Sequence, residues 1–324
     1  MFETLREVGE GILIPLQKPG KPRGPCSSLR PVTLLNSIRK AFSLVVLGRF
    51  REEADDYIPC SQSAYRRGHS TADIVFAKRI QCDTVINKVF EFHMLGIDLS
   101  RAFDTVDRKR LLEVTSRITS SNDVCRMVHA LLDNTTLQVR VGKSLADQFK
   151  ATVGTPWGDR FSPVAFNGYY EASLQELRAQ APPRPSEDDH TGLPPETQYA
   201  DDLDFLSTAA DHLERLHDQA LETLPTWNLK ANAEKTERVH VHVADSLQRR
   251  DKEDWRRSKT LGSFLGVEED VSNRISEAAA VMKKLWGLWG GTSCLPRGET
   301  QSFQRSRAAC LAAQLRHVGA QQST

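Results

Sequence analysis

The chain of 324 residues lacks several features that would assign it to a class at once. Its six cysteines form no C-x-x-C pair and are widely spaced, which argues against a zinc module and a disulfide framework. The longest apolar run, residues 41–47, is far shorter than the roughly 18–20 residues that span a bilayer. The N-terminus has no signal-peptide pattern. We therefore expect a globular, intracellular protein with free thiols and no membrane partner.

Net charge is also almost absent, at +1, with 43 Lys and Arg against 42 Asp and Glu. Such a balance normally argues against a nucleic-acid protein. The charges are segregated, however, because residues 11–51 contain eight basic residues and no acidic one. Residues 187–222 contain eleven acidic residues and one basic residue. The small total therefore conceals a basic and an acidic module, and it does not exclude nucleic acid.

Apolar periodicity and turn signals predict a mixture of helices and strands. Strands are expected at residues 11–17, 92–98, 137–141, 145–153 and 239–243, with a hairpin turn at Gly142 and a strand–turn–strand at 199–207. Helices are expected at residues 36–54, 70–90, 107–119, 122–133, 162–179, 209–224 and 271–288, the second of them opened by a capping box from Ser70 to Asp73. Ser162 is the expected N-cap of its helix, with Pro163 at the first helical position. The mixture predicts an α+β fold with an antiparallel sheet and helices on one side.

Two histidines form a weak candidate for a metal site. His240 and His242 are spaced so that both side chains of a strand would lie on one face. The valines that alternate with them favour a simpler reading, in which the histidines form the exposed face of a half-buried strand.

Aspartates stand at the ends of two apolar strands. Asp98 ends the first, and Asp201 and Asp202 interrupt the second. A carboxylate in such a position is costly to hold unless it meets a cation. Mg²⁺ relieves the repulsion between converging carboxylates, and two such ions can clamp the attacking and leaving oxygens of a phosphoryl transfer. For Asp104 and Asp204, capping of a surface turn is an equally good account.

Eight ordered segments resemble the motifs of reverse transcriptases of non-long-terminal-repeat (LINE-type) retrotransposons. They are LRPVTLLN (29–36) with Lys40, QSAYRRGHST (62–71), IDLSRAFDTVD (97–107), GTPWGD (154–159) with Ser162 and Pro163, YADD (199–202), residues 229–236, LGS (261–263) and the start of a helix at Arg274. In family terms these are the fingers segments, motifs A to D, the primer grip and the first thumb helix. Their order and continuity make the resemblance specific.

The resemblance implies a right-hand polymerase fold of fingers, palm and thumb. Residues 1–92 would form the fingers and residues 93–258 the palm. Helical and hairpin elements of the fingers, at 107–153, and a proline- and acid-rich loop, at 181–197, would be inserted in the palm. Residues 259–324 would hold the primer grip and the start of a thumb that is truncated.

The resemblance also assigns roles to single residues. It implies that Asp98 and Asp201, with Asp202 beside them, bind two Mg²⁺ ions, with Mn²⁺ as an alternative. Lys235 matches the lysine that protonates the pyrophosphate leaving group, although an exposed loop lysine is an equally simple account. Leu261 and Gly262 match the primer grip.

The nucleotide site implied by the resemblance draws on several segments. Its members are Lys18, Arg30, Leu99, Phe103, Gly154, Pro156, Trp157 and Gly158. Arg30 and Lys18 would contact the triphosphate, because a guanidinium suits a polyphosphate; the alternative is a solvated basic loop. Phe103 would exclude a 2′-hydroxyl, and its alternative is an ordinary core phenylalanine.

Motif B departs from the family pattern. Trp157 stands where the family has glutamine, and Arg160 stands where small residues are common. Glutamine offers both a donor and an acceptor, whereas tryptophan offers one donor and more bulk.

We therefore expect an RNA-directed DNA polymerase that uses an RNA template, a DNA primer and deoxynucleoside triphosphates, probed best by primer extension. The alternative is a decayed or truncated copy that binds nucleic acid without polymerising. An unrelated Mg²⁺ phosphotransferase would explain the aspartates but none of the ordered motifs. The element's endonuclease is expected on a longer polyprotein, and the site of action is expected in the nucleus.

Overall fold

The computed structural model describes residues 9–88, 90–133, 135–156, 158–232, 235–242 and 255–289. The chain divides into two compact units, Met1–Leu265 and Gly266–Thr324. Within the second unit the described element is the helix α10 (Val267–Trp289). Among the described residues, no helix combines the length and the apolar character needed to cross a membrane. The predicted boundaries between fingers, palm and thumb stay a prediction.

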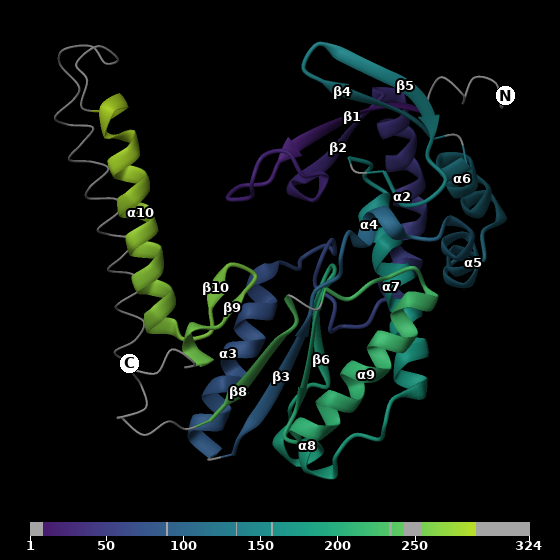
Figure 1. Ribbon diagram of the computed structural model, residues 1–324. Helices are drawn as coiled ribbons and strands as arrows, with labels where there is room; N and C mark the ends of the chain where they lie inside the picture. Colours follow the sequence, from purple (N-terminus) through teal and green to yellow (C-terminus); the bar gives the residue numbers. More distant parts are fainter. Residues whose placement is uncertain are drawn as a thin grey trace. The chain divides into compact units, whose positions relative to one another are not determined.

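The larger unit is built on two four-stranded sheets (Figure 1). The strands are β1 (Glu10–Gln17), β2 (Leu29–Leu35), β3 (Phe92–Ile97), β4 (Thr136–Val141), β5 (Ser144–Lys150), β6 (Glu196–Tyr199), β7 (Asp202–Ser207), β8 (Glu237–Val241), β9 (Lys259–Thr260) and β10 (Ser263–Phe264). The helices are α2 (Ser37–Tyr57), α3 (Thr71–Lys88), α4 (Ala102–Thr105), α5 (Arg108–Ile118), α6 (Asn122–Asp133), α7 (Ser162–Gln180), α8 (Ser186–Thr191) and α9 (Ala210–Thr226). The predicted strands and helices are present to within a few residues, whereas β2, α4, α8, β9 and β10 were not predicted. An α+β fold with an antiparallel sheet is confirmed.

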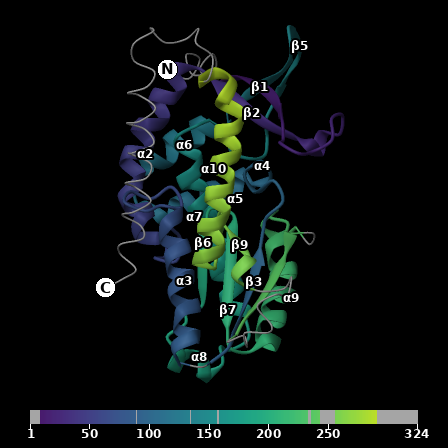
Figure 2. The same cartoon turned by 90° about the vertical axis from the view of Figure 1, so that its left-hand side faces the viewer.

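The central sheet has the order β6-β7-β3-β8 and is antiparallel throughout. Phe92 and Met94 of β3 pack in one apolar cluster with α3, while Leu95 and Ile97 pack in another with α9. Figure 2 shows α3 and α9 on opposite sides of this sheet. The prediction of helices on one side was wrong, because both alternating sets of residues on β3 are apolar.

The helix α7 forms the middle of the main core. Phe166, Tyr169 and Tyr170 on it are fully buried, and the helix packs on α2, α5 and α9. A helix that is buried nearly all round needs no amphipathic pattern. Ser162 is not its N-cap: Phe161 takes that position without a side-chain bond, and the carboxylate of Asp159 accepts a hydrogen bond from the Phe161 amide at 3.0 Å.

The N-terminal sheet has the order β2-β1-β4-β5, and its β1–β4 pairing is parallel. The predicted hairpin at Gly142 is confirmed. One member of the basic segment, Arg39, lies in the core and not on the surface. Its guanidinium donates to the Leu131 carbonyl at 2.7 Å and lies 3.8 Å from Asp159. Arg39 therefore does not contribute to the basic surface of this region.

The proline- and acid-rich segment 181–197 is more ordered than a mobile loop. It contains α8, and the Asp188 side chain on that helix is fully buried. Its carboxylate accepts hydrogen bonds from the amide and hydroxyl of Thr208 at 2.7 and 2.6 Å and pairs with Arg184 at 3.1 Å. These bonds fasten the segment to the end of β7.

Candidate active site

The aspartates of motifs A and C meet at one end of the central sheet. Asp98 directly follows β3, and Asp201 lies in the two-residue turn that joins β6 to β7, with Asp202 as the first residue of β7. Since β3 and β7 are neighbouring antiparallel strands, the end of one lies beside the start of the other. Strand pairing therefore brings Asp98 next to Asp201 and Asp202, which lie more than a hundred residues later in the chain.

The loop after α9 brings Lys235 to Asp98. The Asn232 amide donates to the Asp98 carbonyl at 2.8 Å, and the Ser100 amide donates to the Lys230 carbonyl at 2.8 Å. Leu99 is buried and forms an isolated bridge with this loop. The Lys235 Nζ then donates to both carboxylate oxygens of Asp98, at 3.0 and 2.9 Å.

Crowding of carboxylates changes their acidity. Burial raises the pKa of Asp201, and the nearby Asp98 adds to the effect. Burial, followed by the charges of Asp201, Asp98 and Asp204, raises the pKa of Asp202 to about 6. Perturbed pKa values of this kind are typical of functional sites. The site is therefore short of positive charge, and Lys235 supplies part of it.

The donor chemistry of this cluster suits a hard divalent cation. Its donors are carboxylate oxygens, which Mg²⁺ prefers, and a cationic ammonium group already lies against Asp98. Within the part of the chain that is described, no three acidic, imidazole or thiol groups are placed to hold one ion together. The residues fit a metal by type and charge, without forming a closed cage of protein ligands.

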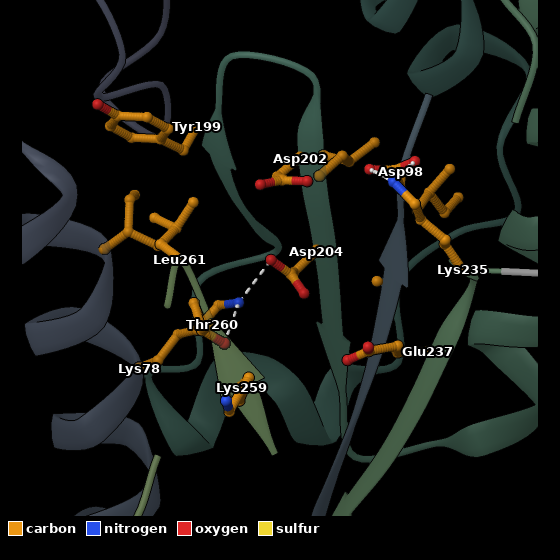
Figure 3. Close-up of a pocket in the computed structure, with 14 residues that line it drawn as sticks. Lys78, Asp98, Tyr199, Asp202, Asp204, Lys235, Glu237, Lys259, Thr260 and Leu261 are labelled. Atoms are coloured by element: carbon orange, nitrogen blue, oxygen red, sulfur yellow. Dashed lines mark hydrogen bonds and ion pairs between the residues drawn. The ribbon is translucent and has the colours of Figure 1, made fainter. Parts of the chain in front are cut away.

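A cavity of about 170 Å³ opens beside the carboxylates. Asp98, Asp202 and Lys235 line it together with Tyr199 and Leu261 (Figure 3). The predicted catalytic residue Asp201 and the predicted primer-grip residue Gly262 are not among the lining residues. Leu261 and the adjacent glycine form the turn between β9 and β10, with φ values of 51° and 82°.

Two charged residues of this cavity have a role that the sequence analysis missed. Lys78 of α3 is only 2% exposed, and its ammonium group lies 2.5 Å from the Asp204 carboxylate and 3.2 Å from the Thr260 hydroxyl. Figure 3 shows this group of three below Asp202. Asp204 is therefore no cap of a surface turn. The signal was present, because Lys78 interrupts the apolar face formed by Ile74 and Cys82.

Backbone strain gathers around the same cavity. Tyr65, Arg101, Ala200 and Leu261 have positive φ although none is glycine. Arg101 follows Asp98 by three positions, and the charge of Asp201 contributes to a raised pKa at Tyr65, after burial. Residues in such conformations cost roughly 1–3 kcal/mol each and cluster at functional sites.

Phe103 lies behind the carboxylates in the short helix α4. Its ring is 8% exposed, stacks on Phe166 at 4.3 Å and meets the edge of Tyr65 at 6.3 Å. The core account of Phe103 is thus correct for one side of the ring. Its predicted role at the sugar stays a prediction.

Motif B packs directly against motif A. The Gly154 and Thr155 amides donate to the Val106 and Phe103 carbonyls at 2.8 and 2.9 Å. A side chain on Gly154 would lie 2.7 Å from the Asp104 carbonyl oxygen, so only glycine fits there. Gly158 has the same constraint, because a β-carbon would lie 2.6 Å from the carbonyl oxygen of Thr33 in β2.

Not all predicted site residues line the catalytic cavity. Gly154 and Pro156 line a second cavity of about 370 Å³ beside β1 and β2. Lys18 and Arg30 lie on the β1–β2 hairpin, where Arg30 is exposed and faces Leu16 across the ladder. Trp157 falls outside the described residues.

Comparison with known protein families identifies the family to which this chain belongs. The family model described as reverse transcriptase (RNA-dependent DNA polymerase) matches residues 16–268. This chain belongs to the reverse transcriptase family.

The chain is also similar to curated RNA-directed DNA polymerases of transposons. It is 25% identical over 235 residues to the probable RNA-directed DNA polymerase from transposon BS of Drosophila melanogaster, covering 69% of the chain and 25% of that relative. It is 23% identical over 261 residues to the RNA-directed DNA polymerase from mobile element jockey of the same species, covering 74% and 27%. The LINE-type resemblance is confirmed, and the chain spans about a quarter of the length of these relatives.

Solved structures agree on the fold. Apo telomerase from Candida tropicalis, truncated from its C-terminal domain, superposes with a TM-score of 0.57 at 14% identity, covering 74% of this chain and 52% of that one. Candida tropicalis telomerase in complex with a fragment of telomeric RNA gives a TM-score of 0.58 at 13% identity, covering 79% and 43%. The right-hand polymerase fold is thus confirmed. Reverse transcriptases as a family depend on divalent metal ions, in keeping with the carboxylate cluster.

Proposed function

We propose that this chain is the RNA-directed DNA polymerase of a LINE-type retrotransposon and uses Mg²⁺, with Mn²⁺ as an alternative ion. One observation supports this most directly: Asp98, Asp201 and Asp202 meet beside Lys235 and the Leu261 turn. A carboxylate cluster next to an ammonium group, at the open end of a sheet, suits nucleotidyl transfer onto a primer 3′ end.

The residues of the chain have distinct tasks in this proposal. Asp98, Asp201 and Asp202 hold the metal ions, which, when bound, stabilise negative charge on the reacting phosphate. Lys235 keeps a proton on Nζ next to Asp98 and gives it to the departing pyrophosphate, as a positioned general acid. The ring of Phe103, fixed by Phe166, limits space at the sugar and favours deoxynucleotides.

The nucleic acid partners follow from the same assignment. An RNA template and a DNA primer would contact the basic β1–β2 hairpin and the β9–β10 turn, and the action would take place in the nucleus. The exposed cations Lys21, Arg23 and Arg30 on the hairpin support contact with phosphates.

Primer extension tests the proposal. The purified chain is given a DNA primer annealed to RNA, deoxynucleotides and Mg²⁺, and we expect extended primer. Asp201→Ala should abolish extension while circular dichroism and the unfolding midpoint stay close to those of the wild type. Failure of the wild-type chain to extend a primer on several templates, with Mg²⁺ or Mn²⁺, would contradict polymerase activity.

A second set of measurements separates polymerisation from binding alone. A chain that only binds nucleic acid should retain a primer–template in a salt-dependent manner without extending it. Restoration of extension by Trp157→Gln would then attribute the defect to motif B, because glutamine supplies both a donor and an acceptor there.

A further inference from the structure

The turn that carries Asp201 has an unusual conformation. Ala200, the residue before Asp201, has φ +56°, in the left-handed region that favours glycine. For a residue with a β-carbon this costs roughly 1–2 kcal/mol, so the surroundings must hold the turn in place. No backbone group in the described chain bonds the Ala200 amide.

The side chain of Gln62 makes the missing bonds. Its Oε1 accepts from the Ala200 amide at 2.9 Å, and its Nε2 donates to the Ala200 carbonyl at 3.2 Å. Gln62 is 1% exposed and Ala200 is 5% exposed, so water does not replace these bonds. A primary amide carries an acceptor oxygen and a donor nitrogen side by side, so it can both accept from and donate to the backbone of one residue.

Gln62 itself is held firmly. The short segment around it pairs with β6: the Ser63 amide donates to the Gln198 carbonyl at 3.1 Å, and the Gln198 amide donates to the Ser61 carbonyl at 2.8 Å. The Arg66 guanidinium donates to the carbonyl of Gln62 at 3.2 Å. Asn167 of α7 donates to the carbonyl of Ala64 at 2.8 Å. The clamp is therefore supported by two separate elements of the core, β6 and α7.

We propose that Gln62 is a positioning residue that fixes the left-handed turn at Ala200 and thereby sets the direction of the Asp201 carboxylate. Its contact is with the backbone of the turn and not with a reacting group. The proposal rests on the proposed function only for its consequence in catalysis; the clamp itself can be measured without activity.

Hydrogen exchange tests the clamp directly. In Gln62→Met, which has similar size but no amide, the Ala200 amide should exchange about tenfold faster or more, because a buried hydrogen bond is lost. The matched control is Gln198→Met. Gln198 is also a buried glutamine and bonds the Gln62 side chain, but its own side chain makes no described bond to Ala200. Equal exchange at Ala200 in Gln62→Met and wild type would overturn the proposal.

Kinetics and rescue test the consequence. Gln62→Met should lower kcat about 10–100-fold, as loss of an outer-shell orienting group does, while the KM for deoxynucleotide stays near the wild-type value. Ala200→Gly, which adopts the turn without strain, should restore much of the lost kcat in the double variant. Absence of rescue by Ala200→Gly would show that Gln62 serves only stability.

The two proposals fail in different ways. Should the wild type extend no primer, the polymerase proposal fails while the exchange experiment still decides the clamp. Should Gln62→Met not fold, Gln62→Glu replaces it: that side chain keeps an acceptor for the Ala200 amide but loses the donor to the carbonyl. Partial protection of Ala200 is then expected, and full wild-type protection would overturn the clamp.

Discussion

At the scale of single residues, backbone strain and close backbone contacts occur where the sequence motifs of this reverse transcriptase meet. Gly154 is tightly enclosed by the motif A backbone, and Ala200 is held in a left-handed turn by Gln62. Burial and the neighbouring carboxylates raise the pKa of Asp202, and Lys235 pairs with Asp98. Each of these features costs free energy of folding, and the buried core formed around α7 offsets that cost.

Substitution of Gly154 and of a second glycine can distinguish the cost of a steric clash from the cost of a positive φ angle. Gly154→Ala should lower the free energy of unfolding by about 2–4 kcal/mol, since the new methyl group would press on the Asp104 carbonyl as well as suffer positive φ. Gly142→Ala is the control, because Gly142 has φ +61° but open space around it, and about 1 kcal/mol is expected. Urea denaturation measures both, and equal losses would refute the packing argument.

The raised pKa of Asp202 predicts that the stability of the fold depends on pH. Its folded-state pKa, about 6, lies above the ordinary value of 3.8, so the folded protein binds this proton more readily than the unfolded chain. The carboxylate therefore destabilises the fold increasingly as the pH rises from about 4 to beyond about 6. Asp202→Asn in EDTA should be more stable than wild type at about pH 8 and should lose this advantage toward about pH 4.

The size of this effect is limited by water, because the Asp202 side chain is exposed at the cavity. We expect at most about 1 kcal/mol after screening. Thermal unfolding of both proteins over the pH series measures the difference. A difference that is constant with pH would contradict the raised pKa.

At the scale of elements, α3 is more than a cover for the central sheet. Lys78 links it to β7 through Asp204 and to β9 through Thr260, so one ammonium group ties a helix to two strands at the edge of the catalytic cavity. A strand pair as short as β9–β10 has little stability of its own. The position of the β9–β10 turn therefore depends on α3.

A double-mutant cycle tests this link. Lys78→Met should lower the free energy of unfolding by about 3 kcal/mol, because it leaves Asp204 without its partner. Lys78→Met combined with Asp204→Leu should recover much of that loss, since no unpaired charge remains. Arg215→Met, which removes an exposed pair with Asp211, should change stability by less than about 0.5 kcal/mol and serves as control.

At the scale of the whole molecule, the charge of +1 is the sum of two opposed regions. The basic residues of the β1–β2 hairpin are exposed, whereas the acids at the β6–β7 turn gather at the catalytic cavity. The proposed attraction of phosphates to one region and of metal ions to the other requires this separation. The total charge reveals neither the basic region nor the acidic region.

Salt dependence should report on the basic region. Arg30→Gln should reduce the slope of log affinity against log salt for a primer–template by about 0.7–0.9, the value for one lost phosphate contact. Arg215→Gln, on α9, should leave the slope unchanged. Fluorescence anisotropy over a series of KCl concentrations measures both. An unchanged slope for Arg30→Gln would remove that residue from the nucleic-acid surface.

Local chemistry explains what could be predicted from the sequence alone. The Ser70–Asp73 capping box, the Gly142 hairpin and the apolar strand before Asp98 depend on neighbours within a few residues, and each lies where it was predicted. The family and its α+β fold followed from ordered motifs, because the catalytic aspartates must end strands that pair.

Long-range packing decided the rest. The burial of Arg39 against Asp159, the pairing of Lys78 with Asp204 and the clamp of Gln62 on Ala200 each join residues that lie more than a hundred positions apart. A side chain's sequence neighbourhood shows that it is polar, but only the folded chain shows which buried group satisfies it. The sequence by itself determined the chemistry of the site and its supporting strands, and the tertiary structure decided which buried side chains hold that chemistry in place.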